Sequence, residues 1–183
     1  MVTGRRSARQ SGAMSTDDTS EARPDPDELL KVYLRRHLAA SAGGVDLFRR
    51  VAGSIPAFAR DEVVRLADDV AADRRGLLDI AGSVGVTQPQ VQETITRIGQ
   101  QLGRLHPAGT LLKRSPLTDV IELEAMKAAT NARILGFRTL QELSDPRLDQ
   151  RHVATLLERA LDQEERIELL RVEAVHRALR PQD

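Results

Sequence analysis

The sequence predicts an all-α protein, and three observations support that prediction. Apolar residues recur every three or four positions in four long segments, the spacing of amphipathic helices. Each of these segments is bounded by residues that favour helix termini. No stretch alternates polar and apolar residues as a half-buried β-strand does. The chain of 183 residues is long enough for one helical domain with a substantial core.

The domain is predicted to cover residues 25–180 and to follow a disordered N-terminal tail, residues 1–24. The tail is rich in Ser, Gly, Arg, Asp and Thr and has few apolar residues. It cannot bury enough surface to offset the cost of ordering. Met14 lies within this tail and is an alternative start to Met1.

The first helix is predicted to begin after Asp25, because an Asp N-cap followed by Pro26 is a strong start signal. Gly43 and Gly44 lower helix stability and predict the close approach of a neighbouring helix. Pro56 ends the segment. The apolar stripe of this helix consists of Leu30, Leu34, His37, Ser41, Val45, Phe48 and Ala52.

The second helix is predicted to begin at Asp61 and Glu62 and to stop at Gly85. Its stripe consists of Leu66, Val70, Asp73, Leu77, Ile80 and Val84. A shorter helix is predicted to follow Pro89. Its apolar side consists of Val91, Ile95, Ile98, Leu102 and Leu105.

Two further long helices are predicted in the C-terminal half. Ser115 and Pro116 begin the first of them, and Asp145 and Pro146 separate it from the second, which runs from about Asp149 to Leu179. The first stripe consists of Leu117, Ile121, Glu124, Ala128, Asn131 and Leu135. The second stripe consists of Val153, Leu157, Ala160, Glu164, Ile167 and Ala174.

The lengths of the connections predict the topology. Short loops join the first two long helices and the last two, which predicts two antiparallel hairpins. A connection of about thirty residues with a short helix lies between the hairpins. Two hairpins joined by one long crossover are the connectivity of a ferritin-like four-helix bundle.

Each predicted stripe carries one ionisable residue: His37, Asp73, Glu124 and Glu164. Inward carboxylates and a histidine in a four-helix bundle are the ligands of a di-metal carboxylate site, which would bind iron or manganese. These four residues are therefore the candidate metal ligands.

The ligand set is incomplete, however, and a structural alternative explains the same residues. Di-metal bundles use two Glu-x-x-His motifs, whereas this chain has one, from Glu173 to His176, near a helix end. Arg74, Arg133 and Arg171 lie near enough in register to neutralise the carboxylates. The four residues would then form a polar layer that sets helix register.

Residues 78–99 suggest a different function, because they resemble a helix-turn-helix motif of bacterial transcription regulators. Ala81 would pack inside, Gly85 would make the turn and Val91 would anchor the recognition helix. The residues that would contact DNA are Gln88, Gln90, Gln92 and Arg97, and Gln pairs well with adenine. That helix has no Lys or Arg before Arg97, so it is poorly equipped for phosphate contacts.

One family resemblance covers about Leu29 to Leu179. It is carried by the segment Tyr33-Leu-Arg-Arg-His-Leu-Ala-Ala-Ser-Ala-Gly-Gly-Val45, by Gly103-Arg-Leu105, by Ser115-Pro-Leu117 and by Glu122-Leu-Glu124. On these motifs the chain resembles a family of small uncharacterised actinobacterial helical proteins. The resemblance implies a ferritin-like bundle with its crossover near 86–105. It implies no assigned activity, so it supplies no catalytic residues. We predict no cofactor, with iron or manganese at the four candidate ligands as the alternative.

Composition narrows the remaining functions. Formal net charge is zero, which gives the chain no overall attraction to nucleic acid. The chain has no cysteine, no apolar run long enough to span a membrane and no phosphate-binding loop. We therefore expect a cytoplasmic, non-enzymatic structural or interaction protein that binds a protein partner or a second copy of itself.

Overall fold

The computed structural model describes residues 24–87, 90–92 and 115–180. Its four long helices are α1 (Pro26–Ser54), α2 (Ala57–Ser83), α4 (Pro116–Gln141) and α5 (Gln150–Leu179). Residues 90–92 are also helical, and no strand occurs in the described ranges. The all-α prediction is confirmed. The predicted tail, apart from Pro24, and most of the predicted crossover helix lie outside the described residues.

The helix termini form as the sequence predicts, with one exception. The Asp25 carboxylate accepts the N–H of Asp27 at 3.0 Å, and Asp149 accepts the N–H groups of Arg151 and His152 at the start of α5. Gly85 follows α2 with a φ of 86°, a conformation that favours glycine. The exception is the start of α2, which begins at Ala57 immediately after Pro56, one turn before the predicted start.

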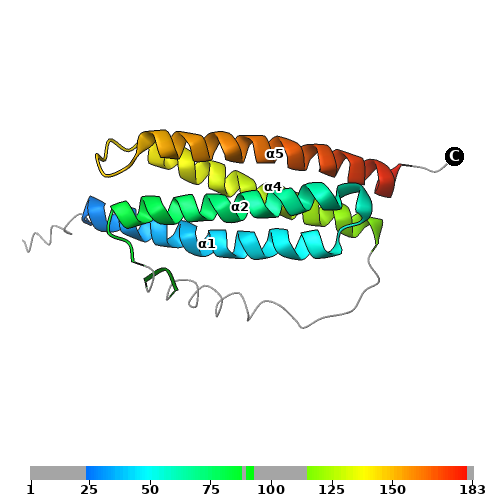
Figure 1. The fold of residues 1–183 in the computed structure, drawn as a ribbon, viewed down its shortest axis with the longest axis horizontal. Helices are drawn as coiled ribbons and strands as arrows, with labels where there is room; N and C mark the ends of the chain where they lie inside the picture. Colours follow the sequence, from blue (N-terminus) through cyan, green and yellow to red (C-terminus); the bar gives the residue numbers. More distant parts are fainter. Residues whose placement is uncertain (1–23, 88–89, 93–114, 181–183) are drawn as a thin grey trace, which may run out of the picture.

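The helices form two antiparallel hairpins that pack side by side (Figure 1). α1 and α2 make the first hairpin, and α4 and α5 make the second. Between the hairpins, α1 contacts α4 and α2 contacts α5. α2 ends at the end of the bundle opposite to the one where α4 begins (Figure 1).

The core contains two separate apolar clusters. The first surrounds the start of α1 and α5, and includes Leu38, Leu77, Ile134 and Ala160. The second occupies the other end of the bundle, and includes Val45, Val70, Met126 and Ile167.

A layer of buried polar residues lies between these two clusters along every long helix. We call it the polar layer, and it consists of Ser41, Asp73, Thr130 and Gln163, together with Arg133. On α2, for example, Asp73 lies between Val70 of the second cluster and Leu77 of the first. The first four residues are at most 6% exposed. A polar layer at mid-height was expected, although only Asp73 of its members was among the four candidate ligands.

The predicted apolar stripe of α4 is wrong. All six of its residues are exposed, and the side chains of Leu117, Ile121 and Leu135 are 46%, 56% and 54% exposed. The buried face of α4 instead contains Val120, Leu123, Met126, Thr130, Ile134, Phe137 and Leu140. α4 is apolar on two sides, so periodicity alone did not identify the side that faces the core.

The glycines that permit close helix packing are not the predicted pair. A β-carbon added at Gly43 or Gly44 would meet nothing within 4 Å. At Gly76 it would lie 2.9 Å from Nε2 of His152, and at Gly136 it would lie 2.9 Å from Nδ1 of His37. A histidine of one hairpin therefore packs against a glycine of the other hairpin at two places.

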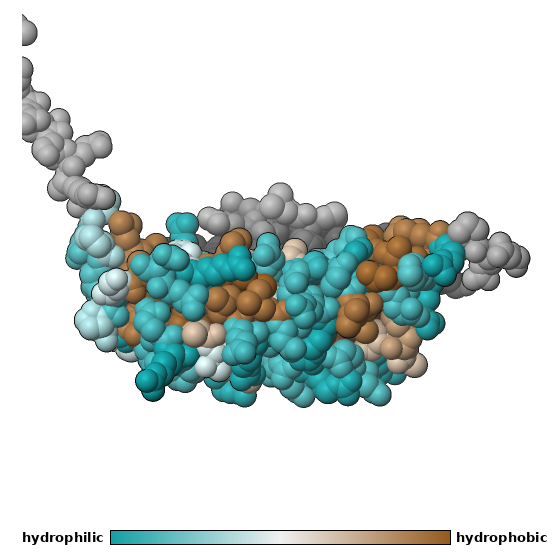
Figure 2. Space-filling model, turned by 90° about the horizontal axis from the view of Figure 1, so that it is seen from above, coloured by the Kyte–Doolittle hydropathy of each residue, from teal (hydrophilic) through white to brown (hydrophobic). Residues whose placement is uncertain are grey.

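The surface on the α5 side of the bundle is mainly hydrophilic, with separate hydrophobic patches (Figure 2). Exposed apolar side chains on α5 include Leu161, Leu169 and Val172. Among the described residues, no helix has the length and apolar character needed to cross a membrane.

Candidate functional site

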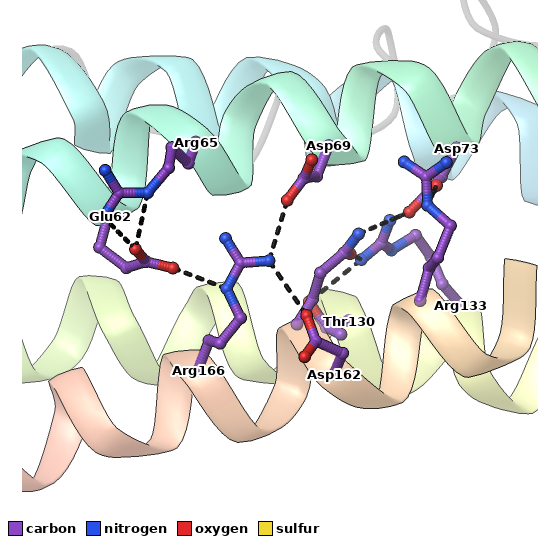
Figure 3. Close-up of polar contacts among 10 residues, drawn as sticks. Glu62, Arg65, Asp69, Asp73, Thr130, Arg133, Asp162 and Arg166 are labelled. Atoms are coloured by element: carbon purple, nitrogen blue, oxygen red, sulfur yellow. Dashed lines mark hydrogen bonds and ion pairs between the residues drawn. The ribbon is translucent and has the colours of Figure 1, made fainter.

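Asp73 is the buried centre of the polar layer. Gln163 of α5 donates a hydrogen bond from Nε2 to Asp73 Oδ2 at 2.7 Å, and Arg133 of α4 donates from Nη1 to the same oxygen at 3.3 Å (Figure 3). Arg159 Nε lies 3.0 Å from Oδ1. That contact is electrostatic, because Oδ1 makes no well-aligned hydrogen bond.

Arg133 connects the layer across the second hairpin. Its Nη2 group donates to Gln163 Oε1 at 2.5 Å and to Thr130 Oγ1 at 3.5 Å. Burial raises the pKa of Asp73, against the hydrogen bond from Gln163 and the charges of Arg133 and Arg159. Burial also lowers the pKa of Arg133, although Asp73 opposes that shift. The layer therefore pairs a carboxylate with a guanidinium, each of which would be costly to bury alone.

The four candidate metal ligands lie in different environments. Asp73 is buried, and His37 is half-buried between α1 and α4, with its ring centroid 4.4 Å from that of Tyr33. Glu124 is exposed, which corrects the expectation that it faces the core. Glu164 is half-buried and pairs with Lys127 Nζ at 2.6 Å on the surface between α4 and α5.

No group of three or more His, Cys, Asp or Glu side chains able to hold a metal ion occurs within 24–87, 90–92 and 115–180. The arginines predicted to neutralise these carboxylates also differ in what they contact. Arg133 pairs with Asp73, and Arg171 Nη1 lies 4.0 Å from Glu124. Arg74 forms no ion pair with Asp73 or with the other candidate carboxylates, and its buried Nε makes no hydrogen bond.

Sequence reasoning missed Gln163, Arg159 and Thr130. A signal for Gln163 was present, because Val153, Leu156, Ala160, Gln163 and Ile167 are spaced three and four residues apart and are all buried. The predicted stripe included Leu157 and Glu164 instead, one residue further along. Both alternatives fit a helical period, and packing against α4 and α2 distinguishes them.

A second ionic cluster joins α2 to α5 beside the polar layer (Figure 3). Arg166 places Nε 2.6 Å from Glu62 and Nη1 2.9 Å from Asp69, both on α2. The same Nη1 lies 3.1 Å from Asp162, one turn earlier on α5. The contacts with Glu62 and Asp69, like those of Asp73, join the first hairpin's carboxylates to the second hairpin's guanidinium groups.

A third ionic cluster consists of Glu168, Lys127 and Arg171, and it predicts how the free energy of unfolding depends on pH. Hydrogen bonds from Arg171 and Lys127 lower the pKa of Glu168 from 4.5 to about 2. A carboxylate with a lowered pKa stabilises the fold above its unfolded pKa, and that contribution is lost as the pH falls from about 4.5 to about 2. The pKa of the Asp73 carboxyl is raised instead, so the stability that its titration contributes is present at low pH and is lost as the pH rises through the folded pKa.

We expect Glu168→Gln to reduce the loss of stability between pH 4.5 and pH 2, which urea unfolding at a series of pH values would measure. Glu165→Gln, at an exposed position of the same helix, is the control. An unchanged acid slope in Glu168→Gln would contradict the assignment.

The helix-turn-helix candidate is only partly described. Ala81 and Val91 are 1% exposed and Gly85 makes a turn, as the motif requires. Gln90 accepts the Thr87 N–H at 3.1 Å, a contact that supports the local turn. Gln92 is exposed. Gln88 and Arg97 lie outside the described residues, so DNA binding through this motif stays a prediction.

Comparisons of the chain with protein families, curated proteins and solved structures found no match. The resemblance to actinobacterial helical proteins therefore also stays a prediction.

Proposed function

We propose that this chain is a ferritin-like four-helix bundle that acts as a non-enzymatic protein-interaction module and associates with a second copy of itself. The connectivity supports the first part, since α2 and α4, which link the two antiparallel hairpins in the chain, end and begin at opposite ends of the bundle. The composition of the polar layer supports a structural role, because its carboxylate is bound by arginine and glutamine instead of by other metal-ligating groups.

The outer face of α4 is the surface through which we propose that two copies associate. This face consists of Leu117, Ile121, Glu124, Ala128, Asn131 and Leu135, and every one of these residues is exposed. Their spacing alternates between four and three residues, which is the repeat by which one helix packs along another. An amphipathic surface helix is usually polar on this side.

The face is suited to a copy of itself. Ala128 near its centre leaves room for close approach of a second helix, and Leu117 and Leu135 lie toward its ends. The charge of Glu124 is partly offset by Arg171, 4.0 Å away. The same stripe on a second copy would bury these leucines and Ile121 on both molecules.

The size of the face indicates a weak complex. A helix of 26 residues is about 39 Å long and about 10 Å wide, which gives about 400 Å² per copy. A standard interface uses about 800 Å² per partner. We therefore expect a dimer that dissociates at micromolar concentrations.

Sedimentation velocity over a range of protein concentrations would test this. The wild type should form a dimer as concentration rises, and Ile121→Lys with Leu135→Lys should stay monomeric, because charges within the interface would be desolvated. Leu169→Lys, at a 73% exposed leucine of α5, should behave as the wild type. A wild type that is monomeric at every concentration would contradict the proposal, as would equal effects of the α4 and α5 substitutions.

A further inference from the structure

A pocket opens between α1 and α4, the two helices through which the hairpins contact each other on one side of the bundle. Its volume is about 250 Å³. Phe48 and Val70, which are each 1% exposed, contribute to its buried wall. His37 and Arg133 supply polar groups to the same pocket.

Small residues on facing helices explain why the pocket exists. Gly43 and Gly44 of α1 and Ala129 and Ala132 of α4 line it, so neither helix fills the space between them. A β-carbon at Gly43 or Gly44 would meet nothing within 4 Å. The pocket is thus bounded by backbone and methyl groups over much of its surface, which suits an apolar ligand.

The polar groups of the pocket favour a negative charge on that ligand. Arg133 is the only charged residue among the described residues that line the pocket, and no carboxylate lines it. Asp73 provides one carboxylate to the two guanidinium groups of Arg133 and Arg159, and Asp69, whose charge also acts on Asp73, is paired with Arg166. Burial lowers the pKa of His37, so its imidazole is neutral at pH 7 and can donate or accept a hydrogen bond.

We propose that this pocket binds a small apolar monocarboxylate, with its hydrocarbon part along Gly43, Gly44 and Phe48 and its carboxylate toward Arg133 and His37. A dry cavity of about 150 Å³ holds benzene. A pocket of about 250 Å³ therefore accommodates a chain of about eight carbons. This proposal is independent of self-association, because it concerns the α1–α4 groove and not the outer face of α4.

Isothermal titration calorimetry of the full chain with octanoate, 1-octanol and octylammonium tests the proposal. Octanoate should bind saturably with a dissociation constant below about 1 mM and at least about tenfold more tightly than either other probe. Gly44→Leu should weaken octanoate binding at least about tenfold, because the new side chain has open space and would occupy the pocket.

Gly53→Leu is the matched control. Gly53 lies on the same helix, is exposed and also has nothing within 4 Å of an added β-carbon, but it does not line the pocket. This variant should bind octanoate as the wild type does. No saturable binding of octanoate would overturn the proposal, as would equal binding of octanol or octylammonium. Unchanged binding by Gly44→Leu would place the ligand elsewhere and overturn it as well.

Discussion

Replacing Asp73 with alanine is expected to lower the free energy of unfolding by about 3 to 5 kcal/mol. The substitution removes the acceptor of the hydrogen bonds from Gln163 and Arg133 and leaves a buried guanidinium without its counter-ion. Urea unfolding followed by circular dichroism at neutral pH would measure the loss.

Asp69→Ala is the control for this prediction. Asp69 lies one turn earlier on α2 and pairs with Arg166 at 2.9 Å, but its side chain is 37% exposed. We expect that variant to lose at most about 1 kcal/mol, as partly exposed ion pairs usually do. Losses of equal size at the two positions would show that the polar layer is no more important than a surface contact.

Substituting glycine with alanine should lower stability at one position and raise it at another. Gly136→Ala should lower stability by about 1 to 3 kcal/mol, because its β-carbon would lie 2.9 Å from Nδ1 and 3.0 Å from Cε1 of His37. Gly43→Ala should raise stability by about 1 kcal/mol, since alanine favours the helix and its β-carbon meets no neighbour. Thermal and urea unfolding of both variants would measure the two effects.

A double-mutant cycle with His37→Ala identifies the cause. If the imidazole is the obstacle, Gly136→Ala should cost less in the His37→Ala background than in the wild type. At Gly76 an added β-carbon would meet Cδ2 of Leu156 at 3.0 Å as well as Nε2 of His152, so the Gly136–His37 pair gives the clearer test. Additive effects in that cycle would contradict the packing described for Gly136.

The comparison of α2 with α4 shows what sequence could predict. Every residue of the predicted α2 stripe is buried, because that helix has one apolar side and a charged opposite side. α4 has apolar residues on two sides, so its sequence predicted a helix correctly and its orientation wrongly. Orientation depends on which side meets α1 and α5, and this is a property of the assembled bundle.

The candidate site was predictable to a similar degree. Asp73 could be identified because it interrupts a clear apolar stripe. Its partners come from residues 60 and 90 positions later in the chain, and no local pattern connects them. The pocket beside Gly43 and Gly44 was missed for a related reason, since a glycine pair is compatible with either close packing or open space.

The distribution of charge between the hairpins has a consequence for how the chain assembles as it is made. Asp27, Glu62, Asp69 and Asp73 of the first hairpin each pair with an arginine of the second hairpin or of its loop, namely Arg133, Arg147, Arg159 or Arg166. During synthesis the first hairpin emerges before the second. The ion pairs between the hairpins therefore cannot form until the second hairpin has been synthesised. Until then the four carboxylates of the first hairpin lack these arginine partners.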